Sequence, residues 1–126
     1  SFEGCRTVVH GRGGRAADAP STIMQLSFKL STIDELRRVR AAALAAGATQ
    51  MRGMNHGNAL SIYFSDLEDN TVEVYLDTPW YVPQPHGDPL DLSKPDDEIW
   101  AETEAICRAD PGFEPVVDWM ARFRSR

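Results

Sequence analysis

A single glutamate stands in a run of residues that otherwise has the pattern of a half-buried strand. Residues 71–77, TVEVYLD, alternate apolar and polar side chains, and Glu73 is at the centre of the polar face. A carboxylate in the interior of a strand either faces water or holds a ligand. Glu73 is therefore the first residue of this chain to consider for binding or catalysis.

Two further polar side chains are expected on the same face as Glu73. Residues 22–30 and 59–64 also alternate, and their apolar positions leave Gln25 and Tyr63 on the polar side. If the apolar faces of all three strands pack on a helix, then Gln25, Tyr63 and Glu73 share the opposite face of one sheet. That face is either solvated, as is common in antiparallel sheets, or the lining of a small cleft.

The elements that would position these side chains follow in the order strand, helix, strand, strand, strand. After the strand at 22–30, Thr32 and Glu35 have the spacing of a capping box, and Gly47 can end the helix in the left-handed conformation. The predicted inner face of this helix is formed by Ile33, Leu36, Val39, Arg40, Ala43 and Leu44. Further strands are predicted at residues 48–54, 59–64 and 71–77, with the turn SDLEDN before the last of them.

The two flanks differ in composition from this central unit at 21–80. Residues 1–20 hold a short strand-like run followed by GRGGRAADAP, which we interpret as a remnant strand and a linker starting at Gly11. Residues 81–126 begin as a proline-rich loop and continue into two predicted helices. We expect these helices, of which the second runs from about Glu114, to pack on the sheet or on a partner subunit.

The inner faces of the two C-terminal helices can be read from their apolar spacing. In the first helix, which Pro95 opens, the shared side is formed by Ile99, Trp100, Thr103, Ile106 and Cys107. In the second helix it is formed by Val117, Met120 and Phe123.

Bulk composition limits the classes of partner. The 126 residues contain 19 acidic and 13 basic side chains and carry a formal charge of −6, which repels nucleic-acid phosphates and anionic lipid headgroups. Neither an apolar run of roughly 18 to 20 residues nor a signal-peptide pattern occurs, so we expect a cytoplasmic protein without a membrane partner. Cys5 and Cys107 match no paired-thiol or zinc spacing, and we expect both to be reduced.

Residues 61–77, SIYFSDLEDNTVEVYLD, resemble the second βαβββ module of the vicinal oxygen chelate superfamily. This superfamily includes glyoxalase I, the extradiol dioxygenases and the fosfomycin and bleomycin resistance proteins. Its usual turn is Asp-Pro-(Asp or Glu)-Gly-Asn before an apolar-Glu-apolar strand, and the chain keeps Asp66, Asn70 and Glu73 but lacks the proline and the glycine. The resemblance covers residues 21–80. It implies an α+β fold with C-terminal helices, in which the first module is incomplete.

The resemblance also implies roles for four residues. Glu73 falls on the glutamate that binds the divalent metal, and Gln25 falls on a ligand position that is usually histidine. His56 and Tyr63 fall on the acid–base histidine and the substrate-binding tyrosine of the extradiol dioxygenases. The remaining metal ligands belong to the first module, of which this sequence contains at most the final strand. Either the chain is truncated or discontinuous, or another subunit completes the site, and the resemblance also implies a homodimer.

Three functions follow as hypotheses from this resemblance. The leading one is an Fe(II)-dependent enzyme resembling extradiol dioxygenases that cleaves a catechol-type aromatic substrate, with Mn, Ni or Zn as alternatives to iron. The second is a binding module of the same fold with no metal, which holds a small hydrophobic molecule as bleomycin resistance proteins do. Gln25 favours the second, and His56 with Tyr63 favours the first. A glyoxalase-type lyase or isomerase is the third.

Two loop histidines are weaker candidates for a functional role. His10 and His86 each precede a glycine, in loops where a histidine is usually only solvated. His86 could line the rim of a cleft together with Trp80 and Tyr81.

Overall fold

A computed structural model describes residues 6–11 and 23–124, with only the backbone described for residues 6–11, 23 and 24. The strands are β1 (Arg6–Gly11), β2 (Ile23–Lys29), β3 (Thr49–Asn55), β4 (Ala59–Ser65), β5 (Thr71–Asp77), β6 (Trp80–Tyr81), β7 (Asp88–Pro89) and β8 (Glu114–Pro115). The helices are α1 (Ile33–Ala45), α2 (Asp96–Arg108) and α3 (Val116–Arg124). The protein is thus an α+β fold, as predicted.

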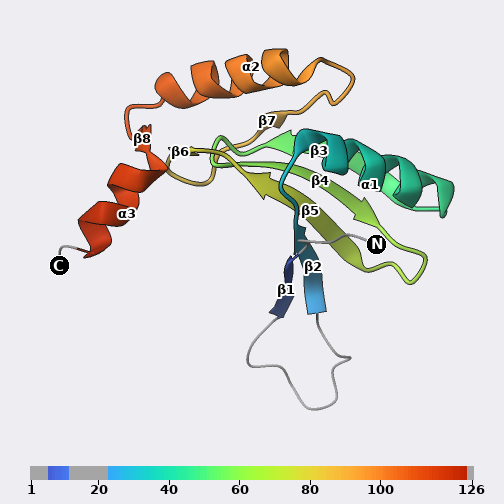
Figure 1. Cartoon of the computed structure of the whole chain (residues 1–126). Coiled ribbons are helices and arrows are strands. Elements are labelled where there is room, and N and C mark those ends of the chain that lie inside the picture. Colours follow the sequence, from blue (N-terminus) through green and yellow to red (C-terminus); the bar gives the residue numbers. More distant parts are fainter. Residues whose placement is uncertain (1–5, 12–22, 125–126) are drawn as a thin grey trace.

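Six of the described strands form one mixed sheet in the order β1-β2-β5-β4-β3-β7. The pair of β2 and β5 is parallel, and the other neighbouring pairs are antiparallel. Figure 1 shows α1 along one face of this sheet, α2 above β6 and β7, and α3 projecting away from the rest of the molecule. Strands β6 and β8 form a separate two-stranded ladder.

Helix α1 begins and ends as the sequence predicts. The backbone N–H of Glu35 donates to Thr32 Oγ1 at 3.1 Å, and that of Thr32 donates to Glu35 Oε1 at 3.0 Å, which completes the capping box. Gly47 follows the helix with a φ of 97°. The predicted inner face was too wide, because Arg40 and Leu44 are exposed.

The core lies between α1 and the apolar face of the sheet. It is formed by Leu30, Ile33, Leu36, Val39, Leu60, Ile62, Phe64, Val72, Val74, Leu76 and Ile99. The alternation predicted for β4 and β5 is therefore confirmed, since every second residue of these strands points into the core. Burying one such aliphatic or aromatic side chain stabilises the fold by about 1.5–3 kcal/mol.

The two C-terminal helices differ in how much they bury. Helix α2 follows Pro95 and buries Ile99, Thr103 and Cys107, and its predicted inner face is confirmed. The predicted start of the last helix at Glu114 is wrong, because Glu114 and Pro115 are extended and pair with β6 before α3 begins.

Helix α3 does not pack on the sheet, because none of its residues is buried within the chain, and its packing on a partner subunit stays a prediction. Val117, Met120 and Phe123 are exposed by 69%, 42% and 56%. A stack between Tyr81 and Trp119, with ring centroids 4.7 Å apart, connects the helix to β6.

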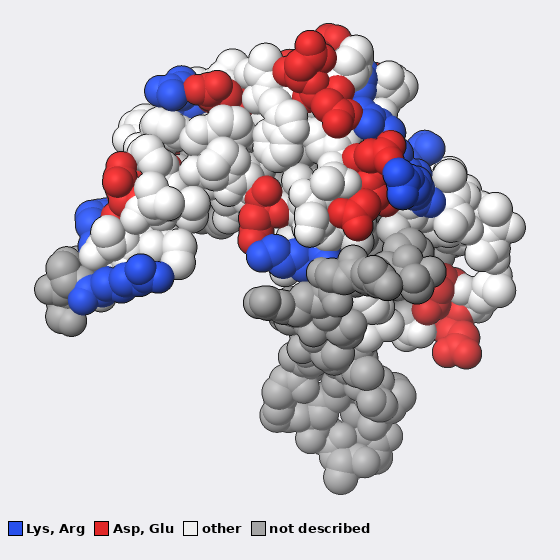
Figure 2. Space-filling view, in the orientation of Figure 1, with Lys and Arg blue, Asp and Glu red and all other residues white. Residues whose placement is uncertain are grey.

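Charged side chains of both signs are distributed over the helices. Figure 2 shows acidic and basic side chains interspersed over α1 and α2, and basic side chains along the free end of α3. Among the described residues, no helix combines the length and the apolar character required to cross a membrane. Gly11 belongs to β1, whereas the rest of the predicted linker and Cys5 lie outside the described residues.

Candidate functional site

The Glu73 side chain is positioned by the two strands beside β5. Glu73 is opposite Ser27 in the parallel pair with β2 and opposite Tyr63 in the antiparallel pair with β4. Residues that face each other across adjacent strands project to the same side of the sheet. Gln25 and Ser61, each two residues along its strand, therefore share this face as well.

Four side chains donate hydrogen bonds to the Glu73 carboxylate. Gln25 Nε2 and Ser27 Oγ donate to Oε1 at 2.8 and 3.2 Å. Ser61 Oγ and Tyr63 Oη donate to Oε2, each at 2.8 Å. Each oxygen thus accepts two bonds, which is the usual capacity of a carboxylate. Because Ser27 and Ser61 are only 1% and 0% exposed, this part of the polar face is not a solvated surface.

The hydrogen bonds continue from Tyr63 to His56. His56 Nε2 lies 2.8 Å from Tyr63 Oη, and His56 Nδ1 lies 2.9 Å from the backbone oxygen of His86. A carbonyl oxygen can only accept, so Nδ1 carries a proton. The network thus connects the imidazole of His56 to the carboxylate of Glu73 through the phenol of Tyr63.

The phenol in the middle of this network is held in its neutral form. Burial raises the pKa of Tyr63 above its ordinary value of 10.0, and the hydrogen bond to Glu73 and the charge of that carboxylate raise it further. A hydrogen bond with Ser61 and the positive charge of Arg52, 5.0 Å from the ring centroid, act in the opposite direction. Tyr63 is therefore a hydrogen-bond donor at neutral pH.

His56 is the first residue of the turn between β3 and β4. Its backbone N–H donates to the oxygen of Ala59 at 2.9 Å. Gly57 follows with a φ of 76°, and a Cβ atom at this position would lie 2.5 Å from Val82 Cγ2. Glycine is required here both by the backbone conformation and by the neighbouring side chain. The turn therefore places the His56 ring with little freedom.

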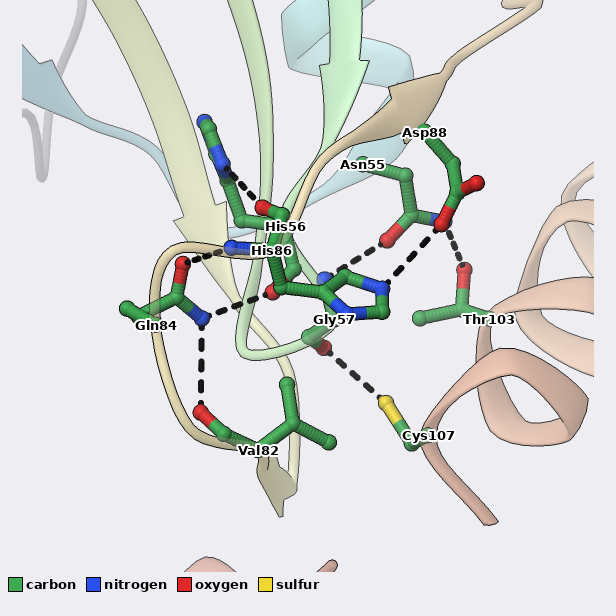
Figure 3. A network of polar contacts seen from close by, with 9 residues as sticks. All are labelled: Asn55, His56, Gly57, Val82, Gln84, His86, Asp88, Thr103 and Cys107. Atoms are coloured by element: carbon green, nitrogen blue, oxygen red, sulfur yellow. Dashed lines mark hydrogen bonds and ion pairs between the residues drawn. The ribbon is translucent and has the colours of Figure 1, made fainter. Parts of the chain in front are cut away.

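Figure 3 shows how the loop after β6 and helix α2 hold this turn. Gln84 Nε2 donates to the backbone oxygen of His56 at 3.0 Å. The backbone oxygen of Gly57 accepts from Thr78 Oγ1 at 2.6 Å and from Cys107 Sγ at 3.4 Å. Segments that are distant in the sequence thus converge on His56 and Gly57 of one turn.

Polar contacts at the end of β3 complete this support. Asn55 Nδ2 donates to Thr103 Oγ1 at 2.8 Å, and Asn55 Oδ1 accepts from the N–H of Gly57 at 2.9 Å. His86 Nε2 is buried and lies 3.1 Å from Asp88 Oδ2, within ion-pair distance but without a well-aligned hydrogen bond. These contacts fix the backbone of His86 so that its oxygen can accept the hydrogen bond from His56 Nδ1.

An open pocket of about 600 Å³ borders the imidazole of His56. Its wall is formed by Met54, His56, Gln84, Pro85, His86 and Gly87. Both ring nitrogens of His56 already have protein partners, so a ligand would meet the carbon atoms and faces of the ring. The wall therefore combines a fixed flat ring, a thioether and a proline ring.

The side chains around Glu73 do not by themselves form a metal site. Gln25 turns its amide nitrogen toward the carboxylate, and an amide N–H₂ group is a donor rather than a metal ligand. Within residues 25–124, no group of three or more His, Cys, Asp or Glu side chains could hold a metal ion. His10 stands opposite Gln25 in the register of β1 and β2, but its side chain lies outside the described part of the chain. A metal at Glu73 would therefore need ligands in addition to the described side chains.

The four side chains predicted for the site form one connected network of hydrogen bonds. The prediction that Gln25, Tyr63 and Glu73 share a face is confirmed, and His56 joins them from the adjacent turn. Their roles as metal ligands and catalytic residues stay predictions. His86 lies at the pocket rim, but Trp80 and Tyr81 pack on Trp100 and Trp119 instead.

Sequence reasoning missed the two serines and the loop that complete the network. Ser27 and Ser61 could have been found, because the alternation that indicates Gln25 and Tyr63 also places them on the polar face. The backbone oxygen of His86 could not, because a main-chain acceptor has no side-chain signal in the sequence.

The comparisons with known proteins leave the interpretation to the geometry of the site. No family model matches the chain, and searches of curated proteins and of solved structures gave no match.

Proposed function

We propose that this chain is a small-molecule-binding protein of the vicinal oxygen chelate type, and that the pocket beside His56 takes a planar aromatic ligand. The proposal depends on the hydrogen-bonded series Glu73, Tyr63 and His56, which ends at the wall of that pocket. The series holds the imidazole in one orientation before a ligand arrives. A preorganised wall lowers the entropic cost of binding.

The chemistry of the wall indicates the class of ligand. A planar aromatic ligand can stack on the fixed imidazole ring, and contacts between aromatic rings contribute about 0.5–1.5 kcal/mol beyond the area that they bury. The sulfur of Met54 adds a favourable contact with an aromatic ring of about 0.3–1.5 kcal/mol. A volume of about 600 Å³ is within the usual range of small-molecule sites. Small neutral aromatics such as indole or a phenol fit these properties.

The family assignment within this proposal has its own support. Elements β2, α1, β3, β4 and β5 follow in the order expected of a βαβββ module, and the turn before β5 contains Asp66 and Asn70. Asp66 Oδ1 accepts from the N–H of Asn70 at 2.8 Å, so the turn closes without the proline and glycine that are usual in the superfamily. Binding without chemistry is a function that the superfamily is known to include.

Titration with indole, followed by calorimetry and by amide NMR shifts, tests the binding proposal. We expect shifts at residues 54, 56 and 84–87. Gly87→Leu should fill the pocket, because a Cβ at Gly87 already lies 2.9 Å from Met54 Sδ. Ala101→Leu is the matched control, since Ala101 is exposed on α2. If indole does not bind, or if both variants bind it equally, the proposal is wrong.

A metal-dependent dioxygenase is the second candidate function. It is favoured by the direct contacts of Tyr63 with both Glu73 and His56, which are the three residues that this chemistry would use. The additional metal ligands would come from a second copy or from residues outside the described part. Chain loaded anaerobically with Fe(II) should then retain the metal and form a yellow ring-fission product from catechol in air. Glu73→Ala should lose the metal, whereas an iron content unchanged by this substitution would argue against the enzyme.

A further inference from the structure

An open groove of about 320 Å³ lies between the end of α1 and the turn that joins β4 to β5. Its apolar lining is formed by three alanines and one phenylalanine, namely Ala43, Ala46, Ala48 and Phe64. Leu67, in the turn, lines the same groove and is 82% exposed. An exposed leucine beside small apolar side chains is typical of a surface that another protein segment covers.

Two carboxylates, those of Asp66 and Glu68, complete the lining of this apolar groove. Asp66 is held by its own turn, because Oδ1 accepts from the N–H of Glu68 at 2.9 Å and from that of Asn70 at 2.8 Å. Among the ion pairs of the described residues, none includes Asp66 or Glu68. The groove is therefore apolar inside and negatively charged at the turn.

Helix α3 has the complementary character. Its exposed apolar side chains, Val117, Met120 and Phe123, are three residues apart, which is the spacing of a helix that binds in a groove. Arg124 follows four residues after Met120, so it lies on the same side of the helix. No ion pair between described residues includes Arg124, whereas Arg122 pairs with Glu114. One side of α3 is thus apolar with a cation at its end.

The two surfaces cannot meet within one chain. Figure 1 shows α3 and the end of α1 on opposite sides of the molecule. Helix α3 is held in place by the ladder of β6 and β8 and by the stack of Trp119 on Tyr81. If these contacts are kept, the helix that enters the groove has to belong to another copy of the chain.

We propose that α3 of one copy docks into the apolar groove of a second copy. The apolar side of α3 would cover the alanines and Leu67, and Arg124 would lie beside Asp66 and Glu68. Opposite charges at the edge of an interface fix its orientation more than they add to its affinity. Because each copy has one helix and one groove, two copies related by a two-fold axis use both contacts, which closes the assembly as a dimer. The dimer does not depend on the ligand proposed for the pocket beside His56.

Sedimentation velocity over a series of protein concentrations tests for the dimer. We expect a reversible equilibrium between monomer and dimer. Leu67→Ser and Met120→Ser should each raise the dissociation constant at least tenfold, because each removes an apolar contact that occurs twice in the dimer. Ala101→Ser, at an exposed position of α2, is the control and should leave the constant unchanged. Leu67 and Met120 are exposed in the single chain, so circular dichroism should show that both variants fold.

Exchange of the two charges tests which surfaces meet. Arg124→Glu and Glu68→Arg should each raise the dissociation constant about fivefold or more, because like charges then face each other in both contacts. An equimolar mixture of these two variants should dimerise about as well as the wild type. Its mixed dimer has one native contact and one contact with both charges exchanged. Arg38→Glu changes the net charge as Arg124→Glu does but is on α1, and it should leave the constant within about twofold of the wild type.

Three results would overturn the proposal. The first is a monomer at every concentration; if Leu67→Ser also destabilises that monomer, a segment of the same chain occupies the groove. The second is a dimer that Leu67→Ser and Met120→Ser leave intact, which would place the interface elsewhere. The third is a mixture of Arg124→Glu and Glu68→Arg that associates no better than either variant alone, which would show that these two residues do not meet.

Discussion

Glu73 is a strand residue whose charge is satisfied entirely by neutral groups. Two serine hydroxyls, a phenol and an amide donate to it, and none of these donors carries a positive charge. Hydrogen bonds to a charged acceptor are stronger than bonds between neutral groups. The carboxylate is thus at the same time a stabilising centre of the sheet and the group that orients Tyr63.

Replacing this carboxylate should destabilise the fold. In Glu73→Gln one oxygen becomes an amide nitrogen, so a donor would face the buried donors on that side. We expect a loss of about 1–3 kcal/mol in the free energy of unfolding, measured by urea denaturation with an unchanged m value. Glu68→Gln, in the exposed turn, is the control and should stay within about 0.5 kcal/mol of the wild type. Equal stability of the two variants would contradict a stabilising role for the network.

Because of Cys107, the free energy of unfolding should fall at alkaline pH. It is 0% exposed, and burial, followed by the charges of Asp110 and Glu104, raises the pKa of its thiol from 9.0 to about 11. The unfolded thiol ionises near pH 9 while the folded one keeps its proton, so stability is lost as the pH rises from about 9 to 11. The loss should be on the order of 2 kcal/mol, and the decline should be shallower in Cys107→Ala. Urea unfolding at pH 8, 9, 10 and 11 measures it, and parallel curves for the two proteins would refute it.

The elements that carry the site are specified by strong local patterns. Strict alternation divides β4 and β5 into a core face and a polar face, and the glycine of the turn before β4 is required by its backbone conformation. Helix α1 covers the core face and leaves the polar face to the hydrogen-bond network. The stability of α1 therefore contributes directly to the position of the sheet and its site.

Removal of the helix cap provides a test at this scale. Thr32→Ala removes the side-chain acceptor for the N–H of Glu35 and should lower the free energy of unfolding by about 1 kcal/mol. Ser31→Ala is the adjacent control, because only its backbone takes part in the cap. Thermal and urea unfolding should separate the two variants. A Ser31→Ala effect as large as that of Thr32→Ala would argue against the cap.

In the whole molecule, the C-terminal helices have unequal roles. Helix α2 contributes Ile99 to the core and connects Thr103 and Cys107 to the turn that holds His56. Helix α3 buries no residue and is attached through the short ladder of β6 and β8. Site and core thus depend on α2 but little on α3.

A pair of alanine substitutions measures this difference between the helices. Ile99→Ala should cost about 2–5 kcal/mol, because it leaves a cavity in the core. Val117→Ala, on the exposed face of α3, should stay within about 0.5 kcal/mol of the wild type. Equilibrium unfolding of both variants at one pH provides the comparison. A large loss in Val117→Ala would show that α3 packs against something in solution.

Much of the fold could be predicted because its signals are local. The capping box, the left-handed Gly47 and the alternation of three strands depend on residues that are close in the sequence. Arg40, Leu44 and the start of α3 were predicted wrongly because spacing shows that a helix is amphipathic but not how much of its surface a partner covers. Pro115 and Glu114 likewise became extended because they pair with β6, a contact across more than thirty residues of chain.

The sequence by itself determined which residues share the polar face, since the direction of a side chain in a strand follows from its position alone. Only the tertiary structure decided what these residues contact. It placed four donors on Glu73, turned the nitrogen of Gln25 toward it, and set His56 between Tyr63 and a backbone oxygen of a distant loop. Such contacts depend on strand register and loop path, which come from the packing of the whole chain.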